Sequence, residues 1–199
     1  MAVVRPFKAL RPAEGKAEKV AVLPYDVMSR KEAKAMAADS PDSFLYVTRS
    51  EIGLPDDVDS YDPQVYAKAF ETLVQMEEDG VLVQDEKPMF YIYRQIMDGR
   101  VQTGLVATFS VDEYLNNKIK KHELTREVKE VDRINHFDAC DANTEPVFLA
   151  YRQQKKIEQL LNDFIKHNKP AAAFTSEDAI SHFFWVISED YLIREIAET

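Results

Sequence analysis

The dipeptide Asp98-Gly99 constrains the fold more than any other local feature, because it separates two strand-like runs. PMFYIYRQIM precedes it and RVQTGLVATF follows it, and both runs are rich in aromatic and β-branched residues. Asp-Gly is a preferred pair for a type I′ turn, whose backbone twist matches that of two antiparallel strands. The sequence therefore predicts a β-hairpin over these two runs.

Several helices have clear start and stop signals. Ser29-Arg30-Lys31-Glu32 has the form of a capping box and opens the short helix KEAKAMAAD. Pro63 suits the first turn of a longer helix that Gly80 ends. The inner face of that longer helix is predicted to consist of Val65, Ala69, Leu73 and Met76, widened by Tyr66 and Phe70.

Three further helices are expected later in the chain. Ser110-Val111-Asp112-Glu113 has the form of a second capping box, and SEDYLIREIAET begins a last helix without a stop signal, a hint that the natural protein continues. RQQKKIEQLLNDFIKHNK is amphipathic, with its inner face formed by Ile157, Leu160, Leu161 and Phe164.

The remaining apolar runs are predicted as strands: VVRPFKAL, KVAVLPYDV, SFLYVTR, NKIKKHE, PVFLAY and HFFWVI, with Trp185 of the last run in the core. Strands and helices do not alternate strictly. The sequence therefore predicts an α+β fold with a mixed sheet, a β-hairpin and several flanking helices. We expect one domain over 1–199, forming the N-terminal half of a longer protein.

Composition excludes several classes of protein. The chain has 199 residues, 45% of them hydrophobic, and a formal net charge of −10, which disfavours a broad nucleic-acid-binding surface. No apolar run approaches the length of a membrane span, and no signal peptide is evident. The single Cys140 and four unpaired histidines predict no structural metal site. We expect a cytoplasmic protein that does not bind membranes.

The charged run KKHELTREVKEVDRINH, at positions 120 to 136, is the densest group of candidate site residues. With a helix capped by Thr125 and advancing ~100° per residue, one arc of about 120° holds Arg126, Lys129, Asp132, Arg133 and His136. The apolar residues Val131, Ile134 and Phe137 fall on the other side, which is predicted to be buried. The charged arc is either a solvated face held by ion pairs such as Lys129 with Asp132, or a binding site.

The residues just before this helix favour a binding site. Lys121 and His122 end a strand-like segment and lead into a helix N-terminus, where backbone N–H groups bind anions. Glu123 beside them has the chemistry of a general base. Together they predict a phosphate site.

Known site motifs do not match this chain. His122-Glu123 begins like the zinc motif H-E-x-x-H, but Arg126 stands where the second histidine is required. Neither G-x-x-x-x-G-K nor G-x-G-x-x-G occurs, which excludes a P-loop and a Rossmann phosphate cradle. Cys140 lies in no nucleophile pattern and is expected to be a packed thiol.

A few other polar residues are candidates. Lys8 and Arg11 flank the end of an apolar strand. Asp26 either caps a turn or holds a metal or a substrate ammonium group. Asn143 either belongs to a turn that feeds the next strand or contacts a ligand.

The segments PFKALRP, PYDVMS, SFLYVTR, FYIYRQ, QTGLVA, IKKHELTR, DRINH, ANTEPVFLAY and HFFWVI, taken together and in order, resemble domain-of-unknown-function family 1015. The resemblance covers essentially all of the chain. It implies a protein about twice this length, with an Asp-Gly-His-His-Arg motif further on. That motif is similar to one in the ParB/sulfiredoxin-like fold, which includes kinases of free L-serine.

The resemblance implies a kinase of free L-serine or a similar hydroxylated metabolite, using ATP or ADP with Mg²⁺. In that case Glu123 or Asp26 would deprotonate the substrate hydroxyl. Residue chemistry then assigns phosphate or substrate binding to Lys8, Arg11, Lys121, His122, Thr125, Arg126, Asp132, Arg133, His136 and Asn143. The alternative is a non-catalytic regulatory or scaffold domain that binds a nucleotide or an amino acid. Its partner in either case would be the missing C-terminal half, and the sequence leaves the oligomeric state unassigned.

Overall fold

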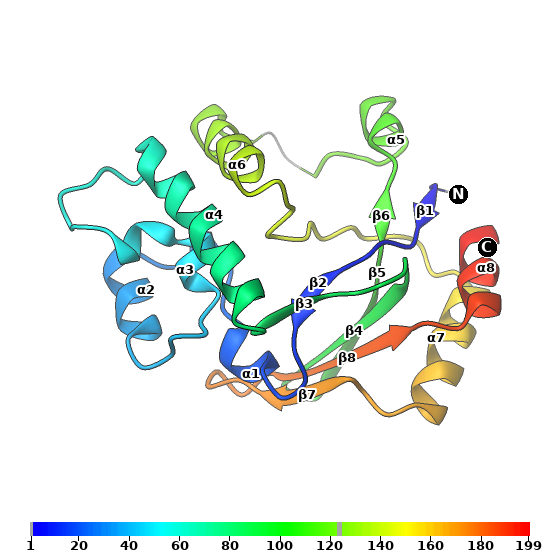
Figure 1. Cartoon of the computed structure of the whole chain (residues 1–199). Coiled ribbons are helices and arrows are strands. Elements are labelled where there is room, and N and C mark those ends of the chain that lie inside the picture. The colour runs from blue at the N-terminus through cyan, green and yellow to red at the C-terminus, as the bar shows by residue number, and fades with distance from the viewer. Residues whose placement is uncertain (1, 123–124) are drawn as a thin grey trace. The chain divides into compact units, whose positions relative to one another are not determined.

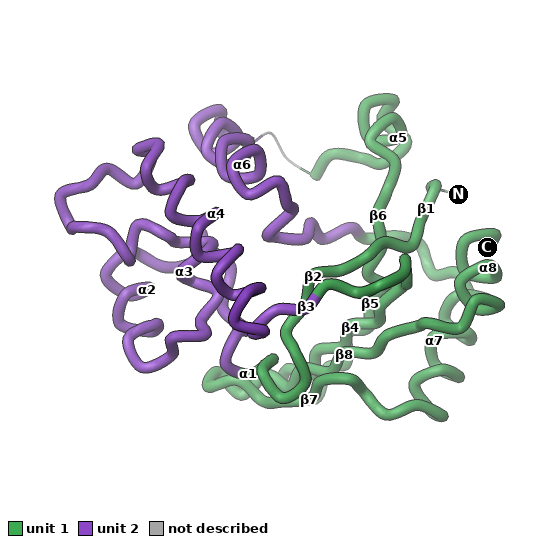
Figure 2. The backbone as a smooth tube through the Cα atoms, in the orientation of Figure 1, with its two compact units in different colours: residues 1–18, 84–122, 150–199 green, residues 19–83, 123–149 purple. Residues whose placement is uncertain are grey.

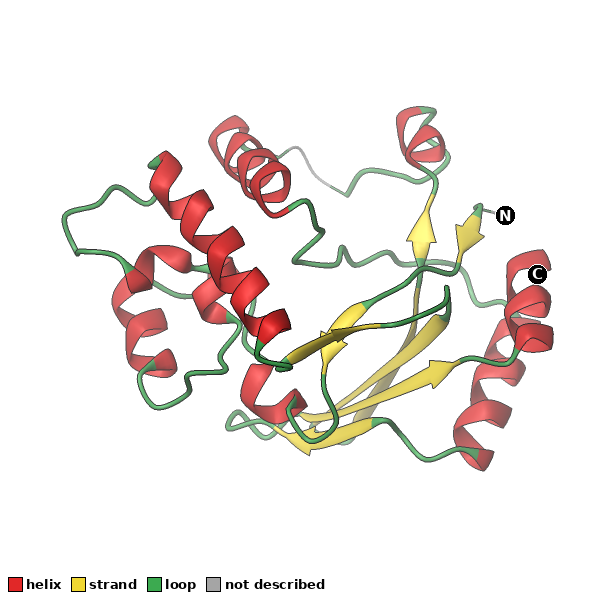
Figure 3. Ribbon diagram, in the orientation of Figure 1, coloured by secondary structure: helices red, strands yellow, loops and turns green. Residues whose placement is uncertain are grey.

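The computed structural model describes residues 2–122 and 125–199, and within them the chain forms two compact units (Figure 2). Unit 1 consists of residues 1–18, 84–122 and 150–199, and unit 2 of residues 19–83 and 123–149. Helices and antiparallel strands are both present without regular alternation, which confirms the α+β class (Figure 1, Figure 3).

Unit 1 is built on a four-stranded sheet. Its strands follow the order β5 (Arg100–Val106), β4 (Phe90–Met97), β8 (Ser181–Ile187) and β7 (Ala172–Thr175). Every pairing in it is antiparallel, so the sheet is not of the mixed type.

The predicted hairpin joins β4 to β5. Met97 pairs with Arg100, and the two turn residues between them, Asp98 and Gly99, have φ of 51° and 75°. Both values lie in the left-handed region that a type I′ turn requires. The hairpin prediction is therefore confirmed.

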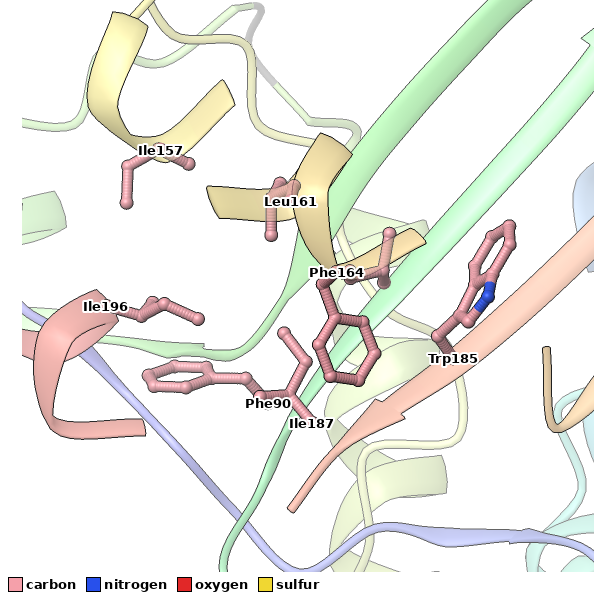
Figure 4. Close-up of a cluster of buried hydrophobic side chains, with 8 residues drawn as sticks. Phe90, Ile157, Leu161, Phe164, Trp185, Ile187 and Ile196 are labelled. Carbon is pink, nitrogen blue, oxygen red and sulfur yellow. The ribbon is translucent and has the colours of Figure 1, made fainter. Parts of the chain in front are cut away.

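One face of this sheet carries the main core of unit 1 (Figure 4). Helices α7 (Lys155–His167) and α8 (Asp190–Glu198) pack their apolar side chains against alternate residues of β4 and β8. The buried residues of this cluster are Phe90, Ile92, Ile157, Leu161, Phe164, Trp185, Ile187 and Ile196. The predicted inner face of α7 and the core position of Trp185 are confirmed.

The opposite face of the sheet centres on Tyr91, which is fully buried. Its ring stacks on Phe184 at 5.5 Å and meets Phe7 edge-on at 5.2 Å, between centroids. Phe7 reaches this face through a backbone bridge to Met89. The N-terminal segment therefore lies along unit 1 as extended chain.

Short elements complete unit 1. β1 (Val4–Arg5) pairs with β6 (Thr108–Phe109), and β2 (Leu10–Pro12) follows. α5 (Val111–Leu115) forms as predicted, but in the described chain the Ser110 side chain forms no capping hydrogen bond. The capping-box prediction is wrong here because the Glu113 carboxylate instead accepts from the Val3 N–H at 2.6 Å and pairs with Lys118.

Unit 2 is helical. It contains α2 (Arg30–Ala37), α3 (Leu45–Thr48), α4 (Pro63–Glu78), α6 (Glu127–Cys140) and the 3₁₀ turns η1 (Tyr25–Val27) and η2 (Ser50–Gly53). α1 (Ala17–Val20) and β3 (Leu82–Gln84) lie at the boundaries of the two units. The Ser29 capping box, the start of α4 at Pro63 and its end before Gly80 are confirmed.

The predicted stripe of α4 is buried except for Phe70, which is 47% exposed and was wrongly included. A second cluster packs α2, α3 and η2 together, and its buried members are Met28, Ala33, Ala37, Leu45 and Ile52.

Four predicted strands are absent from the described residues. SFLYVTR contains α3 and ends just before η2, whereas KVAVLPYDV ends α1 and then forms η1. PVFLAY is irregular, with Val147 and Phe148 about four-fifths exposed, and 117–122 has no regular structure. Short apolar runs do not distinguish a strand from a buried helical turn.

No described helix has the length and apolar character needed to cross a membrane.

Candidate functional site

Helix α6 turns its polar side inward. Its buried residues are Asp132, His136 and Cys140, four residues apart along one face. Val131 and Ile134 are about half exposed, so their predicted burial is wrong. The apolar pattern was misleading because the inward polar groups all find partners in unit 2, which removes the cost of burying them.

Asp132 is held from two sides. The Tyr66 hydroxyl of α4 donates to its Oδ1 at 3.1 Å, and the Arg133 guanidinium pairs with its Oδ2 at 2.9 Å. The side chain of Asp132 is only 7% exposed and that of Arg133 18% exposed. The predicted Lys129–Asp132 pair is thus replaced by one with the neighbouring arginine.

Arg133 also contacts residues from two loops. Its guanidinium carbon lies 4.0 Å from the centroid of the Tyr25 ring, a cation–π distance. One of its nitrogens lies 3.5 Å from a carboxylate oxygen of Glu145. Arg133 therefore contacts two carboxylates and an aromatic ring.

Glu145 has a perturbed environment. Burial raises the pKa of its carboxyl group, while Arg133 and a hydrogen bond from the Tyr25 backbone N–H oppose the shift, and the negative charge of Asp26 adds to it. Burial likewise raises the pKa of the Tyr25 hydroxyl, against the nearby cations Arg133 and Lys129. A carboxyl group with a raised pKa is suited to proton transfer near neutral pH.

Lys129 lies one helical turn before Arg133 on α6. Its ammonium nitrogen is 5.8 Å from the ring centroids of both Tyr25 and Tyr61. We call the group Tyr25, Asp26, Lys129, Asp132, Arg133 and Glu145 the Arg133 cluster. It holds two cations and three carboxylates around one tyrosine ring, within a single unit.

The backbone around Tyr25 is fixed by Arg49. Its guanidinium donates to the carbonyl oxygens of Tyr25 at 2.7 Å and Met28 at 2.9 Å, and it pairs with the buried Glu51 at 2.7 Å. These bonds hold η1 against α3 and η2. The Tyr25 ring is therefore positioned by the fold.

His136 lies next to the cluster and is 2% exposed. Its Nε2 is 3.0 Å from the Val47 carbonyl oxygen, so Nε2 carries the proton and donates. Nδ1 then accepts from the Thr144 hydroxyl at 3.3 Å. Burial lowers the pKa of His136 despite its bond to Val47. The side chain is a neutral structural donor rather than a free ligand for substrate.

Cys140 is buried beside His136, as the sequence predicted. Its sulfur is 3.9 Å from the His136 Nδ1, and burial raises the pKa of the thiol to about 11. A thiol that stays protonated is a poor nucleophile.

The predicted site residues do not all lie in one unit. Asp26, Thr125, Arg126, Asp132, Arg133, His136 and Asn143 belong to unit 2, and Lys8, Arg11, Lys121 and His122 to unit 1. Glu123 lies outside the described residues. Of the unit 2 residues, Asp26, Asp132 and Arg133 meet in the Arg133 cluster, which His136 adjoins.

The other predicted residues have separate surroundings. Arg11 forms a two-pronged ion pair with Asp85, and the Lys121 ammonium lies 4.9 Å from the Tyr114 ring centroid. Thr125 donates to Glu130 at 3.0 Å, and Arg126 precedes the first residue of α6. The remaining three, Lys8, His122 and Asn143, are exposed.

The sequence did not single out Glu145 and Tyr61. Glu145 follows a turn and has no motif around it, and Tyr61 lies in an acidic loop. Only the fold brings their side chains to α6. In the described ranges, no group of three or more His, Cys, Asp and Glu side chains is arranged to hold a metal ion.

The geometry defines an α+β protein with a partly buried, charged and aromatic cluster on one helical unit. Residues 4–199 match the family described as "Protein of unknown function (DUF1015)", and the chain belongs to that family. The predicted family resemblance is thereby confirmed, although the match assigns no activity. Comparisons with curated proteins and with solved structures gave no match.

Proposed function

We propose that this chain supplies the substrate site of a nucleotide-dependent kinase that phosphorylates free L-serine or a similar hydroxylated metabolite. The observation that supports this most is the placement of Glu145 beside Arg133. A carboxyl group with a raised pKa accepts a proton from a substrate hydroxyl, and a guanidinium stabilises charge on the transferring phosphoryl group. The two parts of phosphoryl transfer thus lie next to each other.

The mixed charge of the Arg133 cluster suits a zwitterion. Asp26 can accept hydrogen bonds from the ammonium group of a free amino acid. The Lys129 ammonium has three N–H donors, so it can pair with the carboxylate of that amino acid and with a phosphate as well. Tyr25 forms an apolar wall between them. A substrate with only one kind of charge would leave part of this cluster unpaired.

Two other predicted residues of unit 2 remain part of the proposal besides the Arg133 cluster. Glu123 and Asp26 are alternative bases to Glu145, and Arg126 would bind phosphate, whereas phosphate binding by Lys121 and His122 of unit 1 stays a separate prediction. ATP or ADP would bring Mg²⁺, which neutralises charge on the phosphates. Asp26 is the exposed carboxylate of the cluster and would be the residue available to that ion.

Phosphorus NMR tests the proposal directly. The chain, and the longest reading frame that contains it, are each incubated with L-serine, Mg²⁺ and ATP or ADP, and phosphoserine is measured. Variants Glu145→Gln, Asp26→Asn and Glu123→Gln identify the base. Glu78→Gln is the matched control, since Glu78 is an exposed residue of α4 in the same unit.

We expect Glu145→Gln to lower the rate of phosphoserine formation by about 10²-fold or more, as loss of a general base does, and Glu78→Gln to leave it unchanged. Equal rates for Glu145→Gln and wild type would remove Glu145 from catalysis. Absence of phosphoserine with either nucleotide, from both folded forms, would overturn the kinase and leave a non-catalytic binding or scaffold domain.

A further inference from the structure

Unit 2 has a hollow between α4 and α6 that the Arg133 cluster does not use. Its volume is about 440 Å³, within the range of small-molecule sites. α4 and the loop before it contribute Tyr61, Pro63, Tyr66 and Ala67, and α6 contributes Asn135, Asp138 and Ala139. The two helices pack against each other, so the hollow lies on a fixed frame (Figure 1).

Small side chains keep the hollow open. Ala67 and Ala139 come from the two facing helices and fill little of the space between them. Tyr66 lies among the lining residues and is only 7% exposed. Its hydroxyl donates to Asp132 and accepts from the Asn135 amide, which fixes its ring.

The polar groups of the hollow include both donors and acceptors. Asn135 donates one amide N–H to Tyr66, and its side chain has a second N–H and a carbonyl oxygen for a ligand. Asp138 adds a carboxylate three residues further along α6. Two acceptors beside a tyrosine ring suit a flat ring that carries an amino group.

A cation lies at the side of the hollow formed by Tyr61. The Lys129 ammonium is 5.8 Å from the Tyr61 ring centroid, and Arg133 follows one turn later on the same helix. A ligand with its ring in the hollow would direct an anionic tail toward Lys129. Nucleotides have this combination of ring and charged tail.

The loop that presents Tyr61 is held in place. The Arg30 guanidinium donates to the carbonyl oxygens of Glu51 and Val58 at 2.7 Å and of Pro55 at 2.8 Å. The Tyr61 backbone N–H donates to Asp59 at 2.8 Å. The ring of Tyr61 is thus carried by a supported loop.

We propose that the hollow between α4 and α6 binds the adenine ring of the nucleotide, with the two N6 hydrogens donated to Asn135 and Asp138 and the phosphates directed toward Lys129. This inference rests on the proposed kinase function, because it names where that kinase holds its nucleotide. It also predicts a preference for bases with an amino group. Hypoxanthine has a keto oxygen at the same position, which would face the acceptor-only carboxylate of Asp138.

The test measures nucleotide binding by calorimetry with Mg²⁺ and without serine, so that it does not depend on turnover. ATP is compared with ITP, which has a keto oxygen in place of the amino group and an N1–H in place of the acceptor N1. Ala67→Leu fills the hollow from an exposed helical position, where leucine is a good helix former. Ala35→Leu, at an exposed position of α2 in the same unit, is the matched control.

We expect ATP to bind about tenfold more tightly than ITP, the effect of about one base-specific hydrogen bond. Ala67→Leu should weaken ATP binding by about tenfold or more, Ala35→Leu should not change it, and Asp138→Asn should reduce the preference for ATP over ITP. Equal binding of ATP by Ala67→Leu and wild type, equal binding of ATP and ITP, or no binding of either nucleotide would each overturn the inference.

These results separate the inference from the proposed function. Nucleotide binding that Ala67→Leu weakens, without any phosphoserine, would keep the site and remove the kinase. Phosphoserine formation with ATP binding unaffected by Ala67→Leu would keep the kinase and place its nucleotide elsewhere.

Discussion

Each unit contains an arginine that contacts both a carboxylate and a tyrosine side chain. The two groups differ in the balance between positive and negative charge. In unit 1, Arg11 pairs with both oxygens of Asp85 at 2.8 to 3.0 Å. Tyr91 donates to the same carboxylate at 2.8 Å and accepts from the Ala9 N–H. In unit 2, Arg133 is shared by Asp132 and Glu145, and the second contact is longer at 3.5 Å.

We interpret the Arg11 group as structural, and the proposed chemical role belongs to the Arg133 cluster. The Arg11 group has one charge of each sign, and its hydrogen-bonding atoms are matched, so it fixes the N-terminal segment to the sheet. The Arg133 cluster has more carboxylate than one arginine can neutralise, and the pKa of Glu145 is raised. Partly buried carboxylates in excess of nearby cations are costly for stability and typical of functional sites.

The largest expected effect is on the Arg11 group. Asp85→Asn removes the charge that Arg11 pairs with and should lower the free energy of unfolding by about 2–3 kcal/mol. The loss stays below that of a fully buried pair because the Arg11 side chain is 27% exposed. Urea denaturation measures it. Asp190→Asn, which breaks the exposed pair with Lys87, is the control and should leave the unfolding midpoint unchanged.

The corresponding substitution in unit 2, Glu145→Gln, should not destabilise the protein as Asp85→Asn does. Because the pKa of Glu145 is raised in the folded state, its charge is disfavoured there at neutral pH, so Glu145→Gln should not lower the free energy of unfolding and can raise it by up to ~1 kcal/mol. The gain should shrink as pH falls through the carboxyl range, where wild type also becomes neutral. A loss as large as that of Asp85→Asn would make both groups structural.

An effect of pH on stability is expected through His136. The folded state lowers the pKa of this histidine, so below the usual value of about 6.5 the unfolded state binds the proton more strongly. The free energy of unfolding should therefore fall as pH falls below that value, by at most ~1.4 kcal/mol per pH unit for this one group. Arg133 adds to the lowering, whereas Asp132 and Glu51 oppose it.

The pH experiment compares urea midpoints from pH 8 to 5. His136→Gln keeps a donor for the Val47 carbonyl and should flatten the profile, whereas His167→Gln, at an exposed position, should not. His182 in unit 1 also has a pKa lowered by burial, so it contributes separately to the pH dependence of stability. An unchanged profile in His136→Gln would show that this histidine does not titrate with unfolding.

Elements that carry their own boundary signals were predictable from sequence. The hairpin turn at Asp98-Gly99, the Ser29 capping box and Pro63 each act through neighbouring backbone. Segments without such signals were not predictable. SFLYVTR and PVFLAY both have strand-like composition, but the first forms a buried helical turn and the second is irregular and largely exposed. The pattern of the whole sequence predicted the α+β class, but it did not predict the structure of these two segments.

The candidate site likewise contains some residues that the sequence could predict and others that it could not. Helical spacing alone places Asp132, Arg133 and His136 on one arc of α6, so these three residues were predictable from the sequence. Tyr25 and Glu145 lie 108 and 12 residues from Arg133 and meet it only through loops that no local pattern describes. The predicted burial of the apolar side of α6 was wrong, because the polar side finds its partners inside unit 2.

The smallest expected effect tests that orientation of α6. Val131→Gln and Ile134→Gln replace half-exposed apolar side chains and should each change the free energy of unfolding by less than ~0.5 kcal/mol, as surface substitutions do. If this face were buried, as the sequence pattern suggested, each would cost several times more. Leu161→Gln, in the core of unit 1 and 4% exposed, supplies the comparison in urea denaturation. A loss at Val131 comparable to that at Leu161 would mean that the apolar face of α6 is covered in solution.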